Sequence, residues 1–308
     1  MQSNTTASQA DSSTHKKDVY EIVTENIIKQ LEKGTVPWKK PWSEGGLPQN
    51  LVSRRHYRGI NILLLGLLGY EHNLFLTYKQ LRDLGGEAKQ GEKPHFAVYW
   101  NYADSKEKEP EAEGEEIVET SGKRKRAVLR YYSVLNIAQC SGIPDKWLPK
   151  EREERTIPSC EDIVRDMPHC PRIQFKQQKA YYNPLEDFVN MPKHKSFESD
   201  EAYYATLFHE LMHSTGHHSR LNRKELLQMS EFGSDTYSLE ELVAEIGTCY
   251  LLSFAGIQGQ FQQSTGYIQG WLNKLRNDKR FILSAASQAQ KAVDYILNIK
   301  ADIDEKEE

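Results

Sequence analysis

The motif His-Glu-x-x-His, formed by His209, Glu210 and His213, constrains this chain more than any other stretch of its sequence. On an α-helix, residues four positions apart lie on one face, so both imidazoles can reach the same metal ion. Glu210 follows the first histidine and can act as general base toward a water molecule. Two histidines at this spacing, with an acid between them, argue against ordinary core histidines. The motif therefore predicts a helix that binds Zn²⁺, with another divalent ion as the alternative.

Signals at both ends limit this helix. Ser199 is a favourable N-cap residue, and Asp200 and Glu201 fall in the first turn, where acidic side chains interact well with the helix dipole. We predict a helix from there to about Thr215, with Gly216 supplying the left-handed residue that ends it. Apolar residues between the polar ones predict that one side of this helix is buried.

A catalytic zinc site uses three protein ligands and leaves one position open. A third histidine at position 219, as in the metzincin pattern, is excluded because Ser219 stands there, and His217 and His218 come too early. The other source of a ligand is a carboxylate on a second helix. Glu241 and Glu245 are four residues apart and would share one helix face.

Glu241 has two interpretations. Ser238 and Glu241 form the capping-box pattern S-x-x-E, which would use the acid at a helix N-terminus. The pattern from Glu241 to Glu245 also resembles that of the gluzincin metallopeptidases, which implies that Glu241 binds the metal and Glu245 orients a ligand histidine from the second shell. A surface position is the alternative for Glu245, but its apolar neighbours disfavour it. We predict His209, His213 and Glu241 as the metal ligands.

Two further features are typical of a metallopeptidase. The segment 179–182 resembles the edge strand with which an extended peptide pairs through main-chain hydrogen bonds in such enzymes. A tetrahedral oxyanion needs a hydrogen-bond donor, and Tyr237, His217 and His218 are the candidates.

The net charge of −4 and the pI near 6.2 restrict any nucleic-acid-binding surface to a local patch. Such a patch is predicted in the N-terminal half, where cations for phosphates alternate with aromatic rings for bases. The candidate DNA-binding residues are Trp38, Lys39, Lys40, Trp42, Arg54, Arg55, Tyr57, Arg58, Tyr78 and Lys79. The alternative is that the tryptophans belong to the core and the cations to an ordinary surface.

Periodicity and composition predict the main elements of this half. Apolar residues at helical spacing predict a helix over 19–31 that ends near Gly34. Runs of β-branched and aromatic residues predict strands over 95–100 and 128–137. The segment 103–126 between them is acidic first and basic later, which predicts a charged, flexible hairpin excursion whose two arms attract each other.

A polar stretch over 144–157 predicts a domain boundary within these residues. The predicted organisation is a disordered leader over 1–17, a first domain over 18–147 and a second over 155–308. The leader lacks the apolar core of a signal peptide, and the longest apolar run, 62–68, is too short to span a bilayer. The four cysteines form no C-x-x-C pair, which argues against a zinc ribbon or a disulfide framework and favours a reducing cytoplasm.

Several motifs in order resemble the ArdC-type antirestriction proteins of conjugative plasmids and phages. They are E-x-G-x-x-P-W-K-K-P-W over 32–42, Tyr57 to Asn61, Thr77 to Gln80, Gly91 to Pro94, His209 to Gly216, Arg220 with Leu221, and Glu240 to Glu245. The resemblance implies an α+β protein with a small α/β domain that binds single-stranded DNA and a zincin-like metallopeptidase domain of gluzincin type. Proteins of this family are implicated in shielding incoming DNA from host restriction.

The predicted function is that of a cytoplasmic antirestriction protein of a mobile element, with a zinc metallopeptidase site. Its predicted partners are single-stranded DNA and a protein of the host restriction machinery, with no membrane. Two other hypotheses stay open. One is a DNA-binding protector whose metal site is structural or vestigial, and the other is a metal-dependent nuclease; Glu210 argues against a vestigial site, since a structural zinc needs no base.

Overall fold

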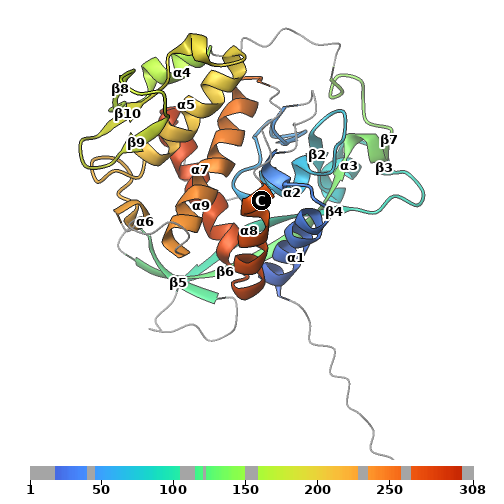
Figure 1. The fold of residues 1–308 in the computed structure, drawn as a ribbon. Coiled ribbons are helices and arrows are strands. Elements are labelled where there is room, and N and C mark those ends of the chain that lie inside the picture. The colour runs from blue at the N-terminus through green and yellow to red at the C-terminus, as the bar shows by residue number, and fades with distance from the viewer. Residues whose placement is uncertain are drawn as a thin grey trace, which may run out of the picture.

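The computed structural model describes residues 18–39, 46–104, 115–120, 123–149, 159–227, 235–257 and 265–299. The chain is an α+β protein of two units (Figure 1). The first unit contains α1 (Val19–Glu32), β1 (Gln49–Asn50), α2 (Ile60–Gly66), β2 (Leu74–Leu76), α3 (Tyr78–Asp83), β3 (Glu87–Ala88), β4 (His95–Asp104), β5 (Glu115–Thr120), β6 (Lys123–Asn136) and β7 (Cys140–Ser141). The second contains α4 (Cys160–Asp166), β8 (Arg172–Gln174), β9 (Tyr181–Asn183), β10 (Phe188–Asn190), α5 (Asp200–Ser214), α6 (Lys224–Leu227), α7 (Asp235–Phe254), α8 (Thr265–Asn277) and α9 (Phe281–Ile296). The predicted leader and most of the predicted domain boundary lie outside the described residues.

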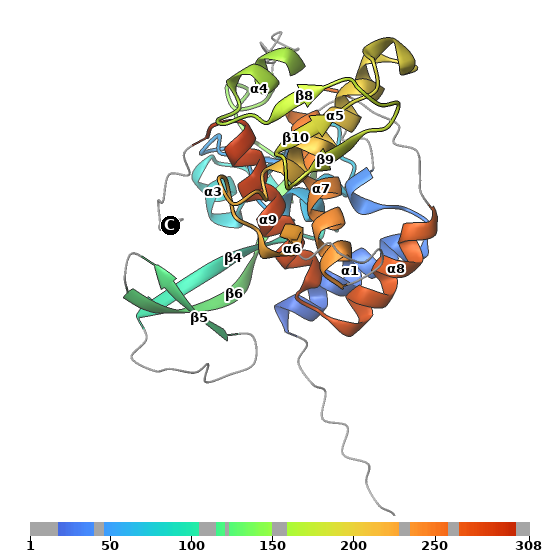
Figure 2. The same ribbon diagram turned by 60° about the vertical axis from the view of Figure 1, so that its left-hand side comes forward.

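The first unit is organised by a sheet with the strand order β1-β2-β6-β4. Strands β4 and β6 pair in antiparallel fashion from His95↔Val134 out to Asp104↔Lys125. The outer ends of β4 and β6, together with β5, project from the helical body (Figure 2). Both predicted strands are therefore present, and both are longer than predicted.

The charged excursion predicted over 103–126 is more regular than predicted. Strand β4 continues to Asp104, residues 115–120 form β5, and β6 already begins at Lys123. Acidic β5 pairs in antiparallel fashion with the basic start of β6, as in Glu119↔Arg124. Backbone pairing turns these parts of the predicted flexible excursion into sheet, while the predicted attraction between its two arms stays a prediction. Residues 105–114, 121 and 122 lie outside the described ranges.

Helix α1 covers one face of this sheet. Its N-terminus is closed by a capping box in which Asp18 Oδ1 accepts a hydrogen bond from the Glu21 amide at 2.8 Å. Gly34, with φ of 75°, follows its end, as the sequence predicts. The ring of Tyr20 meets that of Trp100 on β4 edge to face, with centroids 6.3 Å apart.

The second unit places helices α5, α7 and α9 beneath a small sheet with the order β8-β10-β9. Strand β9 is therefore an edge strand of this sheet, and it contacts α5. Helix α7 packs closely on α5 at Gly247, where an added Cβ would lie 1.8 Å from Cε of Met212. A glycine at this position lets the two helices that carry the metal-binding motif approach each other.

The two units share one hydrophobic core, and α1 lies beside α8 in both views (Figures 1 and 2). The indole of Trp38 is fully buried and packs edge to face on Trp271, with centroids 5.0 Å apart. Hydrogen bonds also join the units, including one of 2.9 Å from the Tyr250 hydroxyl of α7 to the Gly59 carbonyl oxygen. Helix α7 is therefore held directly against the first unit.

None of the helices in the described ranges has both the length and the apolar content needed to cross a membrane. All four cysteines are free thiols. Burial raises the pKa of the Cys140 and Cys160 thiols to about 11, so both stay protonated and unreactive at neutral pH.

Candidate metal centre

Helices α5 and α7 bring the three predicted metal ligands together. His209 and His213 lie one turn apart on α5, and Glu241 reaches them from α7. The N-cap of α5 is Ser199, whose hydroxyl accepts a hydrogen bond from the Ala202 amide at 3.2 Å, as the sequence predicts. The capping-box interpretation of Glu241 is wrong, because α7 begins at Asp235 and Glu241 lies inside the helix.

The distances between the three side chains fit a tetrahedral ion. The two Nε2 atoms of His209 and His213 are 3.2 Å apart, and each lies 3.6 Å from a carboxylate oxygen of Glu241. Ligand atoms about 2.0–2.2 Å from a tetrahedral zinc are separated from one another by about 3.3–3.6 Å. Two imidazoles and one carboxylate also match a catalytic rather than a structural zinc site.

A fourth residue, Glu240, orients one of the ligands. Its carboxylate is fully buried and lies 3.1 Å from Nδ1 of His213, on the side of the ring away from Glu241. Burial by itself would raise the pKa of Glu240, but hydrogen bonds from Arg223 and His213 hold this pKa below its usual value. Glu240 is therefore a carboxylate, and it directs the Nε2 atom of His213 toward the metal position.

The structure adds a supporting acid that the sequence analysis did not name. The Glu240 carboxylate contacts the predicted ligand His213. Glu245 is partly buried four residues along α7 from Glu241, and its second-shell role stays a prediction. The signal for Glu240 was present in the sequence as two adjacent acids in an otherwise apolar segment, because neighbouring residues on a helix point about 100° apart.

Arg223 completes this support. Its Nε and Nη2 atoms donate to Glu240 at 2.9 and 2.5 Å, and further bonds reach the Met212 carbonyl oxygen and the Thr215 hydroxyl at the end of α5. Gly216 does not have the left-handed conformation that we predicted for it. It is needed instead because a Cβ there would lie 3.0 Å from the Arg223 guanidinium.

The pKa of His213 is unusually high. Burial alone would lower its pKa, but the hydrogen bond to Glu240 and the charges of Glu241, Glu240 and Glu210 raise this pKa to about 9. Glu210 is the residue next to His209 on α5. Glu210 is partly exposed, as a group that must meet a substrate has to be.

The raised pKa predicts that metal binding depends on pH. A metal ion binds neutral imidazole, whereas His213 is protonated below about pH 9 in the metal-free protein, so binding displaces a proton. We expect the apparent affinity for Zn²⁺ to rise about tenfold for each pH unit between about 6.5 and 8.5, because one proton is released. Titration with a competing chromophoric chelator measures this slope, and an affinity that does not change with pH would contradict it.

The edge strand β9 is tied to the end of the motif helix by Arg220, whose side chain is almost fully buried. Arg220 donates to the Ser214 carbonyl oxygen at 2.7 Å, to the Tyr182 hydroxyl at 3.1 Å and to Asp187. His217, one of the candidate oxyanion donors, is engaged by Ser219 at 2.8 Å. His218 is exposed, and the side chain of Tyr237, the third candidate, lies outside the described residues.

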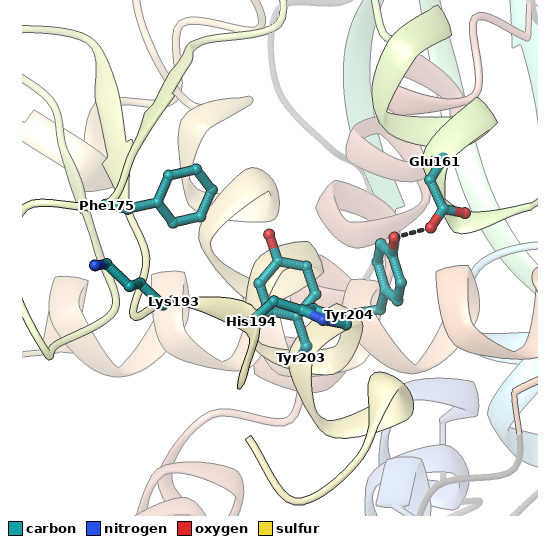
Figure 3. Close-up of a pocket in the computed structure, with 6 residues that line it drawn as sticks. All are labelled: Glu161, Phe175, Lys193, His194, Tyr203 and Tyr204. Carbon is teal, nitrogen blue, oxygen red and sulfur yellow. Dashed lines mark hydrogen bonds between the residues drawn. The ribbon is translucent and has the colours of Figure 1, made fainter. Parts of the chain in front are cut away.

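A separate hollow of about 470 Å³ lies at the N-terminal end of α5 (Figure 3). Tyr203 and His194 meet edge to face at its centre with ring centroids 4.2 Å apart, while Phe175 and Lys193 lie on one side. Tyr203 precedes Glu210 by seven residues, or about 10 Å along the helix. The residues that line the hollow include none of the three metal ligands.

The ten predicted DNA-binding residues do not form one surface of exposed rings and cations. Trp38 and Tyr57 are buried, so the prediction that they stack on bases is wrong. Trp38 fills the core between the units, as the alternative interpretation holds. The exposed members are Arg54, Arg55, Arg58, Tyr78 and Lys79. Lys40, Trp42 and the Lys39 side chain lie outside the described residues.

The exposed cations of this set face different parts of the molecule. Arg54 lies over the ring of Trp147, with its guanidinium carbon 5.8 Å from the centroid. Arg58 forms an ion pair with Asp294 of α9, which belongs to the second unit. Cations that are close in the sequence therefore do not lie on one common surface.

Two families match the two units. Residues 17–135 match the N-terminal domain of the anti-restriction factor ArdC, and residues 160–288 match a zincin-like metallopeptidase family. The second match includes all three metal ligands. It also agrees with the two-unit α+β organisation of the structure.

Relatives cover nearly the whole chain. A DNA primase TraC of Escherichia coli is 32% identical over 299 residues, which are 92% of this chain and 27% of the primase. The chain thus spans only about a quarter of that relative. The uncharacterised protein y4eC of Sinorhizobium fredii (strain NBRC 101917 / NGR234) is 32% identical over 292 residues, with 91% of each chain covered.

Solved structures of the antirestriction protein ArdC from plasmid R388 are similar along the whole chain. The metal-free structure is 35% identical, with a TM-score of 0.71, and the match covers 91% of this chain and 97% of ArdC. The Mn(II)-bound structure has the same identity and TM-score, and covers 93% and 100% of the two chains.

Proposed function

The chain belongs to the family of the antirestriction protein ArdC, and from this premise we propose that it protects the incoming DNA of a mobile element from host restriction. It does so with two activities, binding of single-stranded DNA by the first unit and metal-dependent peptide hydrolysis by the second. The protein substrate is a component of the host restriction machinery. We place the protein in the cytoplasm, a setting that suits its four free thiols.

One observation carries the peptidase half of the proposal. His209, His213 and Glu241 converge at distances that suit one ion, and the acid Glu210 follows His209 on α5 without being one of the three. Three ligands leave an open coordination position, which a catalytic site needs and a structural site lacks. This arrangement favours a peptidase over a vestigial or purely structural metal site.

The chain's own residues can perform the proton transfers of amide hydrolysis. The ion, when bound, supplies an activated water and polarises the substrate carbonyl. The Glu210 carboxylate accepts the proton of the attacking water and returns it to the leaving amine. Strand β9 offers a free edge to an extended peptide, and Arg220 holds this strand against α5.

We propose zinc as the resident ion, with Mn²⁺ as the second candidate. Two imidazoles and one carboxylate suit zinc, and imidazole nitrogen is a poorer ligand for Mn²⁺ than for Zn²⁺. The relative whose crystal structure is Mn(II)-bound supports binding of a divalent ion.

The experiment that tests the peptidase half compares the wild-type protein with Glu241→Ala. We expect the wild-type protein to cleave a degenerate library of quenched fluorescent peptides and to lose this activity with a chelator. Glu241→Ala should bind zinc about a hundredfold more weakly and lose cleavage, because it removes a direct ligand. Peptides left intact by the zinc-loaded wild type would refute a peptidase, and cleavage of labelled DNA by the metal-loaded protein would favour the nuclease hypothesis.

A further inference from the structure

The β4–β6 ribbon carries most of the exposed tyrosines of the described residues. Tyr99, Tyr102 and Tyr131 are 38%, 44% and 53% exposed, and all three lie on this pair of strands. Large exposed rings are unfavourable in water unless a partner covers them. The projecting ribbon in Figure 2 is therefore a candidate binding surface that the sequence motifs did not identify.

The strand register divides these rings between two faces. Residues directly opposite each other in an antiparallel pair share a face, and the pairs Tyr99↔Arg130 and Ala97↔Tyr132 alternate with Val98↔Tyr131. The rings of Tyr99 and Tyr132 meet at 5.7 Å, which confirms that they share one face. Tyr131 points to the other face, where it packs against Phe96.

Both faces continue inward to buried residues, and they differ in the cation that stands beside their rings. The Tyr131 face, which also carries Tyr102, reaches Trp100 and Leu129 of the core beneath α1, and the Tyr99 face reaches Ala97 and Val134 of a smaller cluster. On the Tyr99 face the rings of Tyr99 and Tyr132 stand beside the exposed Arg130, and Arg126 follows four residues along the same strand. Neighbouring aromatic rings and guanidinium groups on an open sheet match what single-stranded nucleic acid requires, since rings stack on bases and cations neutralise phosphates.

We propose that the face of the β4–β6 ribbon formed by Tyr99, Tyr132, Arg130 and Arg126 is the surface that binds single-stranded DNA. It deepens the DNA-binding half of the proposed function and rests on it. Bases stack on the two tyrosines, and the guanidinium of Arg130 contacts the adjacent phosphate. Recognition of this kind tolerates any sequence, because every base has a π-face.

Binding of a fluorescently labelled oligothymidylate of about 16 nucleotides to the full-length protein tests this surface. We expect Tyr99→Ala to weaken binding about tenfold and Tyr99→Phe to leave it unchanged, because phenylalanine keeps the ring for stacking. Arg130→Gln should weaken binding and reduce the slope of log K against log salt concentration by about 0.7, as expected for one lost phosphate contact.

Tyr131→Ala is the matched control, because this tyrosine neighbours Arg130 on the same strand, is more exposed than Tyr99 and points to the opposite face. Its affinity should equal that of the wild type. Equal affinity of Tyr99→Ala and wild type, or an equal loss in Tyr131→Ala, would overturn the assignment of this face while leaving DNA binding itself intact. A wild-type protein that does not bind the oligonucleotide would overturn both proposals. Thermal unfolding of each variant verifies that the fold is unchanged.

Discussion

Replacing Glu210 with glutamine is expected to lower the rate of peptide cleavage by about a hundred- to ten-thousand-fold while the protein keeps its metal. Glutamine preserves the size of the side chain, but its amide cannot accept a proton from water at neutral pH. The three residues that converge on the metal position are His209, His213 and Glu241, so the ion does not depend on Glu210. Cleavage of the peptide library and metal content, measured on the same preparation, give the two readouts.

Glu201→Gln is the matched control for this variant. Glu201 is an exposed acid in the first turn of the same helix, remote from the ligands, and its substitution changes the net charge by the same amount. We expect full cleavage activity from Glu201→Gln. Unchanged cleavage by Glu210→Gln would show that another group is the base, and loss of the ion would show that Glu210 has a structural role.

The same variant separates the two halves of the proposed function. If peptide hydrolysis is needed for antirestriction, the Glu210→Gln protein will fail to protect incoming DNA from restriction, although it still binds single-stranded DNA. Full protection by a metal-loaded Glu210→Gln protein would instead assign the protective role to DNA binding alone. A transfer assay into a restricting host measures this difference.

Replacing Glu240 with alanine is expected to destabilise the protein by about 3–5 kcal/mol and to weaken metal binding about ten- to a hundredfold. The substitution leaves the guanidinium of Arg223 buried without its counter-ion, since Arg223 donates two hydrogen bonds to Glu240. It also removes the carboxylate that orients His213. Urea unfolding and zinc titration measure the two effects separately.

A double variant separates the effect of Glu240 on the stability of the fold from its effect on the orientation of His213. Arg223→Met with Glu240→Leu replaces the buried ion pair by apolar side chains of similar size, which is often neutral or stabilising. We expect it to recover most of the free energy of unfolding but not the metal affinity, because His213 still lacks its partner. Recovery of both would show that Glu240 acts only through the fold. The milder Glu240→Gln variant keeps a hydrogen-bond acceptor and should fall between the wild type and Glu240→Ala.

The elements predicted best from the sequence are those that depend on local spacing. The helix that carries His209 and His213 begins at the predicted cap Ser199, because capping and helical repeat involve residues only a few positions apart. The predicted helix 19–31 and its stop at Gly34 are confirmed for the same reason. Strand β10 and helix α8 were not predicted, since short or weakly periodic segments take their structure from their neighbours.

The sequence assigned Trp38 and Tyr57 to a DNA surface because rings stood next to cations, yet both are buried. Composition cannot distinguish a ring that stacks on a base from a ring that packs on Trp271, which lies more than two hundred residues further along the chain. The exposed ring of Tyr99 and the half-buried ring of Tyr132 had been assigned simply to strands. Which side chains of a strand stay exposed depends on which elements pack against that strand. Such packing joins residues that are far apart in the sequence.

The sequence by itself determined the pair of histidines, the acid between them and the family, because these follow from residues at fixed local spacing or from motifs in order. Only the tertiary structure decided that Glu240 supports His213, that Gly216 makes room for Arg223, and that Tyr99 and Arg130 lie exposed on the same face of the β4–β6 ribbon. The physical reason is that burial and ion pairing depend on how α5, α7 and the sheet pack together. No local repeat along the chain specifies that packing.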